Sequence, residues 1–347
     1  MAENRHYGLD LLRIIAMFMI VLGHSISHSE IKATVMPFEP SFIIAWLMLA
    51  FVLSATNCYV LISGYFLSAR EQIKTERIKK LIGTVFFYSV TIALILFACG
   101  FHIGIMQIPQ IIFPVLTNSY WFITAYLAMF LLAPYMNKLI AVLEKQDYLR
   151  LLAAGAFLLC VWPTFFIAYL GKLSPLAWVG WFSYLYLVAG YIRKFGLPFK
   201  KWHYAAGYAL FSLMPFAAKM TLSYILLKYR GSTEGSAFLY EYNFIFLFPA
   251  SVCLFMLFEK SSIDNAFFRK FISGIAPLTL AVYIITEHFL LRKAFWHYIV
   301  PQDICGSGLK MPIMLIAISM AVFSSAALIE YIRRLMTGAL AKYVHRS

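Results

Sequence analysis

Ten stretches of mostly apolar residues follow one another along this chain. Each is about 20 residues long, which is enough to cross the hydrocarbon core of a bilayer. Inside a bilayer the backbone polar groups must find partners within the segment, and a helix of this length satisfies them. The sequence therefore predicts an all-α polytopic transmembrane helix bundle with about ten spans, covering 8–28, 42–66, 78–101, 119–137, 149–170, 178–195, 203–226, 242–259, 275–299 and 311–333.

Composition excludes a separate soluble domain of ordinary size. Of the 347 residues, 62% are hydrophobic and 13% are charged, whereas about a quarter of the residues in soluble domains are charged. Too few polar residues remain to cover a second core. We therefore expect residues 1–347 to form a single integral membrane domain.

The basic residues predict how the bundle is oriented. The chain has 29 Lys and Arg against 15 Asp and Glu, a net charge of +14. If the chain crosses the membrane at the ten predicted spans, 20 of the basic residues lie on the side of the N-terminus and five lie on the other side. Cytoplasmic loops of membrane proteins carry such an excess, so the expected topology is N-in and C-in. The positive charge is thus explained by topology, and no nucleic-acid partner is expected.

Two further features of the chain bear on its organisation. The five cysteines show no paired spacing, so neither a disulfide framework nor a metal site is indicated. The stretch 101–118 contains Pro109 and Pro114 in an apolar setting, which favours an interfacial or re-entrant segment.

The first span holds three ionisable residues, Asp10, Arg13 and His24, in an otherwise apolar helix. Such residues are costly in a membrane and often mark functional sites. Arg13 and His24 are eleven residues apart, so they share a helix face about 16 Å apart along the axis. One interpretation is structural, in which Arg13 reaches the interface, Asp10 pairs with it and His24 hydrogen-bonds within the bundle. The other is catalytic, because a histidine can take a proton from a hydroxyl near neutral pH.

Four motifs resemble those of the acyltransferase 3 family of integral membrane acyltransferases. The first is Gly-Leu-Asp-Leu-Leu-Arg followed after ten residues by His24. Ser-Gly-Tyr-Phe-Leu closes the second span, and Tyr-Trp-Phe-Ile-Thr-Ala-Tyr opens the fourth. Tyr-Ile-Ile-Thr-Glu-His lies late in the chain, in the expected order. Together they extend over almost the whole sequence.

The resemblance implies a membrane O-acyltransferase of the bacterial cytoplasmic membrane. It would transfer an acyl group, usually acetyl, from acyl-CoA to a hydroxyl of a cell-surface polysaccharide or its lipid-linked precursor. Acetyl-CoA or another acyl-CoA would be a substrate, with no permanently bound cofactor. The expected catalytic residues are His24, Arg13 and Asp10. His24 would be the general base, Arg13 is the other residue of the motif, and Asp10 would pair with Arg13.

The donor is expected at the basic loop after the second span. Coenzyme A carries several phosphate charges, which a cluster of cations can bind. The family often has Arg-x-x-Arg here, and this chain has Arg77 and Lys80 at those two positions. There is an alternative interpretation: the same charges could reflect only the positive-inside rule or contact with anionic lipid. The expected acyl-CoA-binding residues are Arg70, Lys74, Arg77, Lys80, Ser63 and Tyr65.

The acceptor is expected in a second polar cluster, in the opposite half of the bundle. A structural ion network would explain these charges equally well, and aromatic residues at span ends are commonly interface anchors. The expected acceptor-binding residues are Glu287, His288, Arg292, Lys219 and Trp121.

A rival class remains open on the sequence alone. A transporter or flippase of a lipid-linked glycan would also have a charged pathway through a helix bundle. Membrane lipids and a glycan are expected partners in either case. The sequence leaves the oligomeric state, a homo-oligomer included, undecided.

Overall fold

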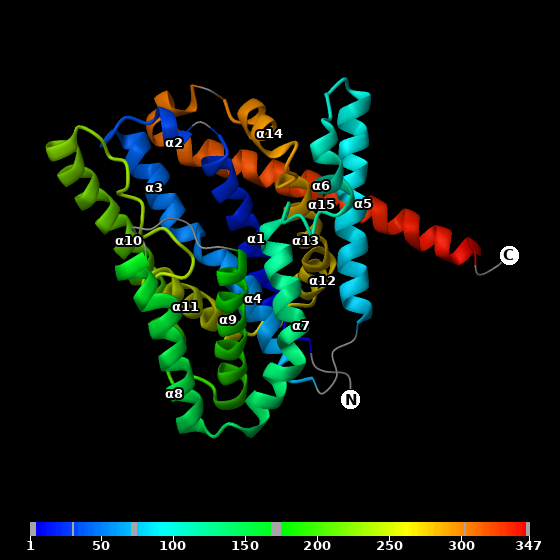
Figure 1. The fold of residues 1–347 in the computed structure, drawn as a ribbon, viewed down its shortest axis with the longest axis horizontal. Helices are drawn as coiled ribbons and strands as arrows, with labels where there is room; N and C mark the ends of the chain where they lie inside the picture. Colours follow the sequence, from blue (N-terminus) through cyan, green and yellow to red (C-terminus); the bar gives the residue numbers. More distant parts are fainter. Residues whose placement is uncertain (1–4, 30, 71–74, 168–174, 302, 345–347) are drawn as a thin grey trace.

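The computed structural model describes residues 5–29, 31–70, 75–167, 175–301 and 303–344. Within these ranges every regular element is a helix and no strand is present. The predicted all-α class is confirmed. The helices lie roughly side by side in one bundle, from which the C-terminal helix projects (Figure 1).

Eight stretches of the described residues are long and apolar enough to cross a membrane. Five are a single helix or a pair: α1 (Tyr7–Ser27), α3 (Pro40–Val52) with α4 (Ser54–Leu67), α5 (Glu76–Ala98), α7 (Trp121–Val142) and α10 (Lys201–Arg230). Two continue through irregular turns: α8 (Lys145–Ala156) with the π-helical η2 (Phe157–Val161) and η3 (Pro163–Ile167), and the 3-10 helix η5 (Ile304–Lys310) with α15 (Met311–Val344). The last joins α12 (Ala266–Ile275), η4 (Ala276–Leu278) and α13 (Thr279–Thr286).

Two predicted spans are helices that do not belong to these eight, so the count of about ten is not confirmed. One is α11 (Leu247–Glu259), whose 13 residues extend for only about 20 Å. The other is α9 (Pro175–Phe195), which packs between α4 and α7 and buries several aromatic side chains, among them Trp181, Phe182 and Tyr186. A helix enclosed by others does not need a continuous lipid-facing apolar surface.

The ninth predicted span differs in position. The sequence predicts 275–299, whereas the spanning stretch runs from Ala266 to Thr286. The chain leaves the helix at Glu287, turns, and forms the separate short helix α14 (Arg292–Ile299). The apolar pattern continues past this turn, which is why the pattern alone misplaces the end of the helix.

Helix α1 lies at the centre of the bundle, in contact with α3, α4, α11, α12, α13 and α15. Gly8 makes one of these contacts possible. A Cβ at this position would lie 2.2 Å from the carbonyl oxygen of Phe258 and 2.6 Å from that of Ser261, at the end of α11. The first helix therefore needs glycine here to approach its neighbour.

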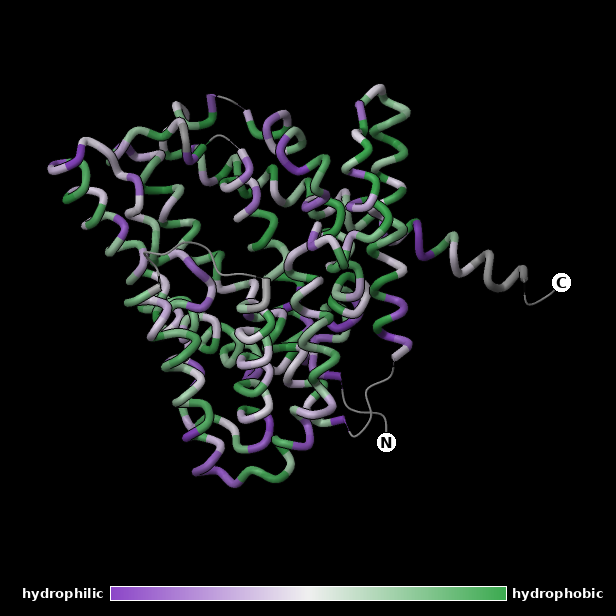
Figure 2. Tube along the Cα trace, in the orientation of Figure 1, coloured by the Kyte–Doolittle hydropathy of each residue, from purple (hydrophilic) through white to green (hydrophobic). Residues whose placement is uncertain are grey.

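The two ends of the bundle are distinguished by what lies at them. The start of α1 and the connection between α7 and α8 lie at the lower end in Figure 1, and α2 (Ile31–Thr34) and α14 lie at the upper end. Hydrophilic residues gather toward both ends (Figure 2). Residues 101–118 form the short η1 (Ile105–Gln107) and α6 (Ile108–Ile112), and α6 packs against α5.

Candidate active site

The buried carboxylate of Glu287 lies close to His24, His28 and Arg292 within the bundle. Glu287, directly after α13, is 4% exposed. Its Oε1 lies 2.6 Å from Nε2 of His28, and its Oε2 accepts a hydrogen bond of 3.1 Å from Nη1 of Arg292. Nδ1 of His24 lies 3.3 Å from Oε1 but is not aligned for a hydrogen bond. The turn after α13 thus places one carboxylate against His24 of α1 and against His28, the C-cap residue of that helix.

His24 also lines a small cavity of about 40 Å³, here named the central cavity. Since Nδ1 is the ring nitrogen close to the Glu287 carboxylate, Nε2 is the ring nitrogen left for a reactant. Nε2 makes no hydrogen bond to the described residues. The cavity is bounded by Met17, Ile20, His24, Thr56, Tyr59, Trp121, Phe122, Tyr242, Leu280 and Tyr283.

A larger cavity of about 340 Å³ lies toward the N-terminal end and is named the N-side cavity. It shares Tyr59, Phe122 and Leu280 with the central cavity. Two arginines, Arg13 and Arg77, are its charged residues, and most of its other lining side chains are apolar. A chamber with cations and apolar walls suits a ligand that joins phosphate groups to an acyl chain or thioester.

A third cavity, the far-side cavity, lies toward the opposite end and has a volume of about 480 Å³. It shares Trp121 and Tyr242 with the central cavity. These two rings are stacked, with centroids 5.7 Å apart. The remaining lining includes two more tryptophans and a tyrosine beside charged groups, namely Trp46, Trp178, Tyr240, Lys32 and Glu241.

Tyr242 carries a phenol group and lines both the far-side and the central cavity. Burial, followed by the nearby Glu241 carboxylate, raises the pKa of Tyr242 to about 12. The phenol therefore stays protonated near neutral pH. Aromatic faces with hydroxyl and charged groups at their edges suit a polyhydroxylated ligand.

Helix α1 contributes to all three cavities in the order of its sequence. Arg13 lines the N-side cavity, His24 the central cavity and Ser27 the far-side cavity. The face that Arg13 and His24 share is therefore the face directed at the cavities. A row of three adjoining cavities follows this helix through the bundle.

Asp10 holds Arg13 rather than lining a cavity. Its two carboxylate oxygens accept hydrogen bonds from Arg13 Nη1 at 2.8 Å and from Arg5 Nε at 2.6 Å. The Arg13 carbonyl in turn accepts a hydrogen bond of 2.8 Å from the Tyr59 hydroxyl. Asp10 is thus placed to position the arginine.

The residues predicted to bind acyl-CoA do not all come together. Ser63 and Arg77 line the N-side cavity. Lys80 lies in a separate groove between α5 and α15. Tyr65 faces elsewhere, because its hydroxyl donates to Glu259. The remaining two are Arg70, whose carbonyl accepts a hydrogen bond from Asn137, and Lys74, which lies outside the described residues.

The predicted acceptor set is also divided. Trp121 lines both the far-side and central cavities, and Glu287 with Arg292 belongs to the histidine cluster. His288 is fully buried with Nε2 3.1 Å from the carbonyl oxygen of Ser89 in α5. Lys219 lies behind the cavity wall, its Nζ 4.2 Å from the centroid of the Trp46 ring.

The structure adds residues of the histidine cluster and of the cavity walls that the sequence does not single out. His28 carries a signal that would find it, because it lies four residues after His24 and thus one turn along the same helix face. Tyr59 and Tyr242 carry none, since tyrosines are common in this chain. Only packing brings them to the cavities.

His24, His28 and Glu287 have ligand atoms within 4.8 Å of one another, a spacing that a metal ion could use. The surroundings favour a proton-transfer cluster instead. Arg292 brings a positive charge to within 3.1 Å of the same carboxylate, which would repel a metal cation. Glu287 also already accepts from His28.

These features define a polytopic helical membrane protein with a histidine between two cavities that lie toward opposite ends of its bundle. A family model described as an acyltransferase domain, that of acyltransferase 3, matches residues 6–331. The chain belongs to this family and is an acyl-transferring membrane enzyme. Neither a curated protein nor a solved structure matches it.

Proposed function

We propose that this enzyme transfers an acyl group, most simply acetyl, from acyl-CoA to a hydroxyl of a cell-surface polysaccharide or its lipid-linked precursor. The donor enters the N-side cavity from the cytoplasm, and the acceptor enters the far-side cavity. His24 is the general base between them. The observation that carries this proposal is the placement of His24 in a small cavity that adjoins a larger one on each side.

The chemistry of the N-side cavity supports the donor assignment. Arg13 and Arg77 provide positive charge for phosphate groups, and arginine binds phosphate with two parallel hydrogen bonds. The cavity narrows beyond Tyr59 and Phe122 into the central cavity, where a thioester carbonyl would meet His24. An acetyl group is small enough for that space.

The far-side cavity supports a carbohydrate acceptor. Trp46, Trp121 and Trp178 present flat apolar faces, against which the C–H faces of a sugar ring can pack. Lys32, Glu241 and Tyr242 supply polar groups at the edges. A sugar hydroxyl passing between Trp121 and Tyr242 would point at His24.

The proposed step is a direct transfer. Nε2 of His24 removes the proton from the acceptor hydroxyl, whose oxygen attacks the thioester carbonyl. The carbon–sulfur bond then breaks, and the thiolate takes the proton from the imidazolium. Glu287 offsets the transient positive charge of the imidazolium, as a carboxylate does in other histidine-based sites, and His28 helps to position that carboxylate through its contact of 2.6 Å.

The dimensions of the central cavity argue against transport of a glycan. A volume of about 40 Å³ accommodates a few water molecules but no sugar ring. A flippase would need this region to widen greatly.

The test compares cells that express the wild type, His24→Ala or no protein. Surface glycans are analysed by mass spectrometry, and the amount of exported glycan is measured in the same samples. We expect His24→Ala to lose the acyl mass while export persists. Loss of export with unchanged acylation would support a transporter and contradict the proposal.

A further inference from the structure

A basic groove lies between α5 and α15, separate from the three cavities, and is here named the α5–α15 groove. Its volume is about 560 Å³. It lies near the start of α5, at the same end of the bundle as the basic loop before it. Its lining consists of Lys80, Gly83, Thr84, Phe87, Arg333, Arg334, Thr337 and Gly338.

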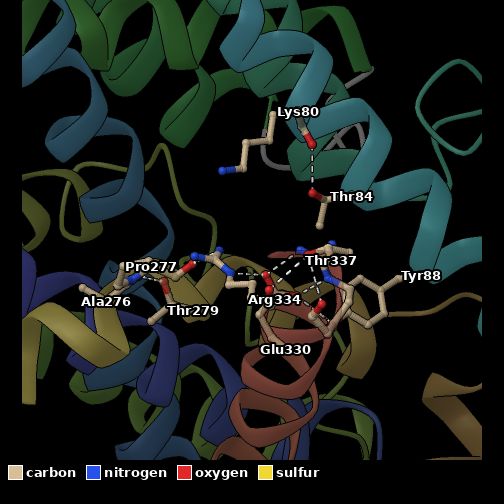
Figure 3. A network of polar contacts seen from close by, with 10 residues as sticks. Lys80, Thr84, Tyr88, Ala276, Pro277, Thr279, Glu330, Arg334 and Thr337 are labelled. Carbon is tan, nitrogen blue, oxygen red and sulfur yellow. Dashed lines mark hydrogen bonds and ion pairs between the residues drawn. The ribbon is translucent and has the colours of Figure 1, made fainter. Parts of the chain in front are cut away.

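The two arginines of the groove are held in fixed positions by a buried carboxylate. Glu330 is 1% exposed and accepts two hydrogen bonds from Arg333, at 2.7 and 2.8 Å, and one from Arg334 at 2.6 Å. The hydroxyl of Tyr88 donates to the same carboxylate at 2.7 Å. Figure 3 shows Tyr88 and Arg334 converging on Glu330. Guanidinium groups restrained in this way lose little entropy when they bind a further anion.

The groove keeps a net positive charge after this pairing. It has three cations, Lys80, Arg333 and Arg334, against the single carboxylate of Glu330. The Lys80 ammonium forms no ion pair with a described residue and extends toward Arg334 (Figure 3). An anion between Lys80 and the arginines would be bound from two helices.

The flanks of the groove are apolar and exposed. Phe87, in the lining, is 42% exposed, and its neighbour Phe86 on α5 and Leu335 on α15 are 45% and 55% exposed. Such surfaces suit acyl chains beside a headgroup. Basic pockets between transmembrane helices near the membrane surface bind the headgroups of anionic lipids. A free phosphate would use the cations but none of these apolar side chains.

The groove also adjoins the wall of the N-side cavity. Nη2 of Arg334 donates a hydrogen bond of 2.7 Å to the carbonyl oxygen of Pro277, and Pro277 lines the N-side cavity. Lys80 follows Arg77 by three residues on α5, yet the two line different spaces. The cations of this region are thus divided between a donor cavity and a groove at the lipid-facing surface.

We propose that the α5–α15 groove binds the phosphate headgroup of an anionic phospholipid, with Lys80 and Arg333 as its contacts and the acyl chains on the flanking apolar surface.

The test uses the full chain purified in a neutral detergent and titrated with phosphatidylglycerol, with bound lipid counted by native mass spectrometry. Lys80→Gln is compared with Lys79→Gln, which removes the same charge one residue away. Lys79 pairs with Glu76 and does not line the groove. We expect Lys80→Gln, and likewise Arg333→Gln, to weaken binding about fivefold, the usual effect of one basic residue near a lipid headgroup. Lys79→Gln should bind as the wild type does.

Other outcomes would overturn the proposal. Equal weakening by Lys79→Gln and Lys80→Gln would indicate diffuse attraction to the basic loop. Displacement of the lipid by inorganic phosphate at the same concentration would assign the site to a free anion. Unchanged lipid binding in Lys80→Gln, with acyl-CoA binding reduced, would assign Lys80 to the donor site. Melting temperatures measured without lipid show whether each variant is folded.

Discussion

At the scale of single residues, His24 derives its position from two parts of the chain. The spacing from Arg13 sets its face on α1, and Glu287 approaches it from the turn after α13. The first of these can be predicted from sequence, because helical periodicity fixes which residues share a face. The second cannot, since Glu287 is distant in sequence and its apolar neighbours continue the helical pattern through the turn.

Replacing His24 by alanine should abolish most of the transfer while the protein remains folded. We expect turnover to fall about a hundredfold or more, the usual contribution of a positioned general base. His24→Gln should not restore it, because an amide does not accept a proton near neutral pH. Acyl transfer and melting temperature are measured on the same purified samples. Near-normal turnover per folded molecule in His24→Ala would show that the histidine only packs.

Replacing Glu287 by glutamine should reduce turnover about tenfold or more. In other enzymes with a catalytic histidine, loss of the carboxylate beside that histidine lowers kcat strongly. The effect should appear in kcat more than in KM, since Glu287 lines none of the three cavities. His288→Gln is the matched control, because His288 is the adjacent residue and is also buried but faces α5. If the two variants lose turnover equally, Glu287 has only a structural role.

Arg77 should contribute to donor affinity. Arg77→Ala removes one of the two arginines of the N-side cavity and should weaken acyl-CoA binding by about 1.5–3 kcal/mol, the contribution of a charged hydrogen bond. Lys79→Ala, in the same turn of α5 but exposed, should have little effect. Calorimetric titration of both proteins with acyl-CoA measures the difference, and equal affinities would remove Arg77 from the donor site.

At the scale of helices, the motif Ser-Gly-Tyr illustrates how neighbouring residues divide their roles. Ser63 lines the N-side cavity, whereas Gly64 allows α4 to approach α9. A Cβ on Gly64 would lie 2.9 Å from the Cα of Tyr186. The sequence indicates that this motif matters but not that its glycine is a packing residue, because the partner helix is over 100 residues away in the chain.

Gly64→Ala should therefore destabilise the protein by about 1–3 kcal/mol, the usual cost of overpacking. Gly83→Ala is the control, since Gly83 lies within α5 and a Cβ there meets no atom within 4 Å. That change should be neutral or slightly stabilising, because alanine favours the helix. Thermal unfolding of both variants in the same detergent decides the matter. A Gly64→Ala protein as stable as the wild type would show that α4 and α9 can separate without cost.

At the scale of the whole molecule, length and apolar pattern are sufficient to predict an all-helical membrane bundle. They do not predict which helices are enclosed by others, because apolarity alone does not separate lipid-facing from buried surface. Helix length is a further feature that the apolar pattern does not give: α11 is counted among the spans in the sequence, but its 13 residues are fewer than those of any of the eight stretches of the structure. The cavities are similarly hidden from the sequence, since their walls come from helices far apart in the chain.

The basic residues still predict the orientation of the bundle. Both termini should be cytoplasmic, because most of the basic loops lie on their side. A reporter that is active only outside the cytoplasm, fused after Ser347, should be inactive. The same reporter inserted between α10 and α11 should be active. The opposite pattern would reverse the assignment of the donor and acceptor cavities.

The narrow central cavity has a bioenergetic consequence. With room for only a few water molecules between Phe122, Leu280 and Tyr283, the bundle gives ions no wide aqueous route, so the enzyme need not dissipate the gradients of its membrane. Only the acyl group passes from one reactant to the other, and the helices do not need to open alternately toward the two sides of the membrane. Turnover should therefore be independent of membrane potential and persist in detergent, where no sealed compartment exists.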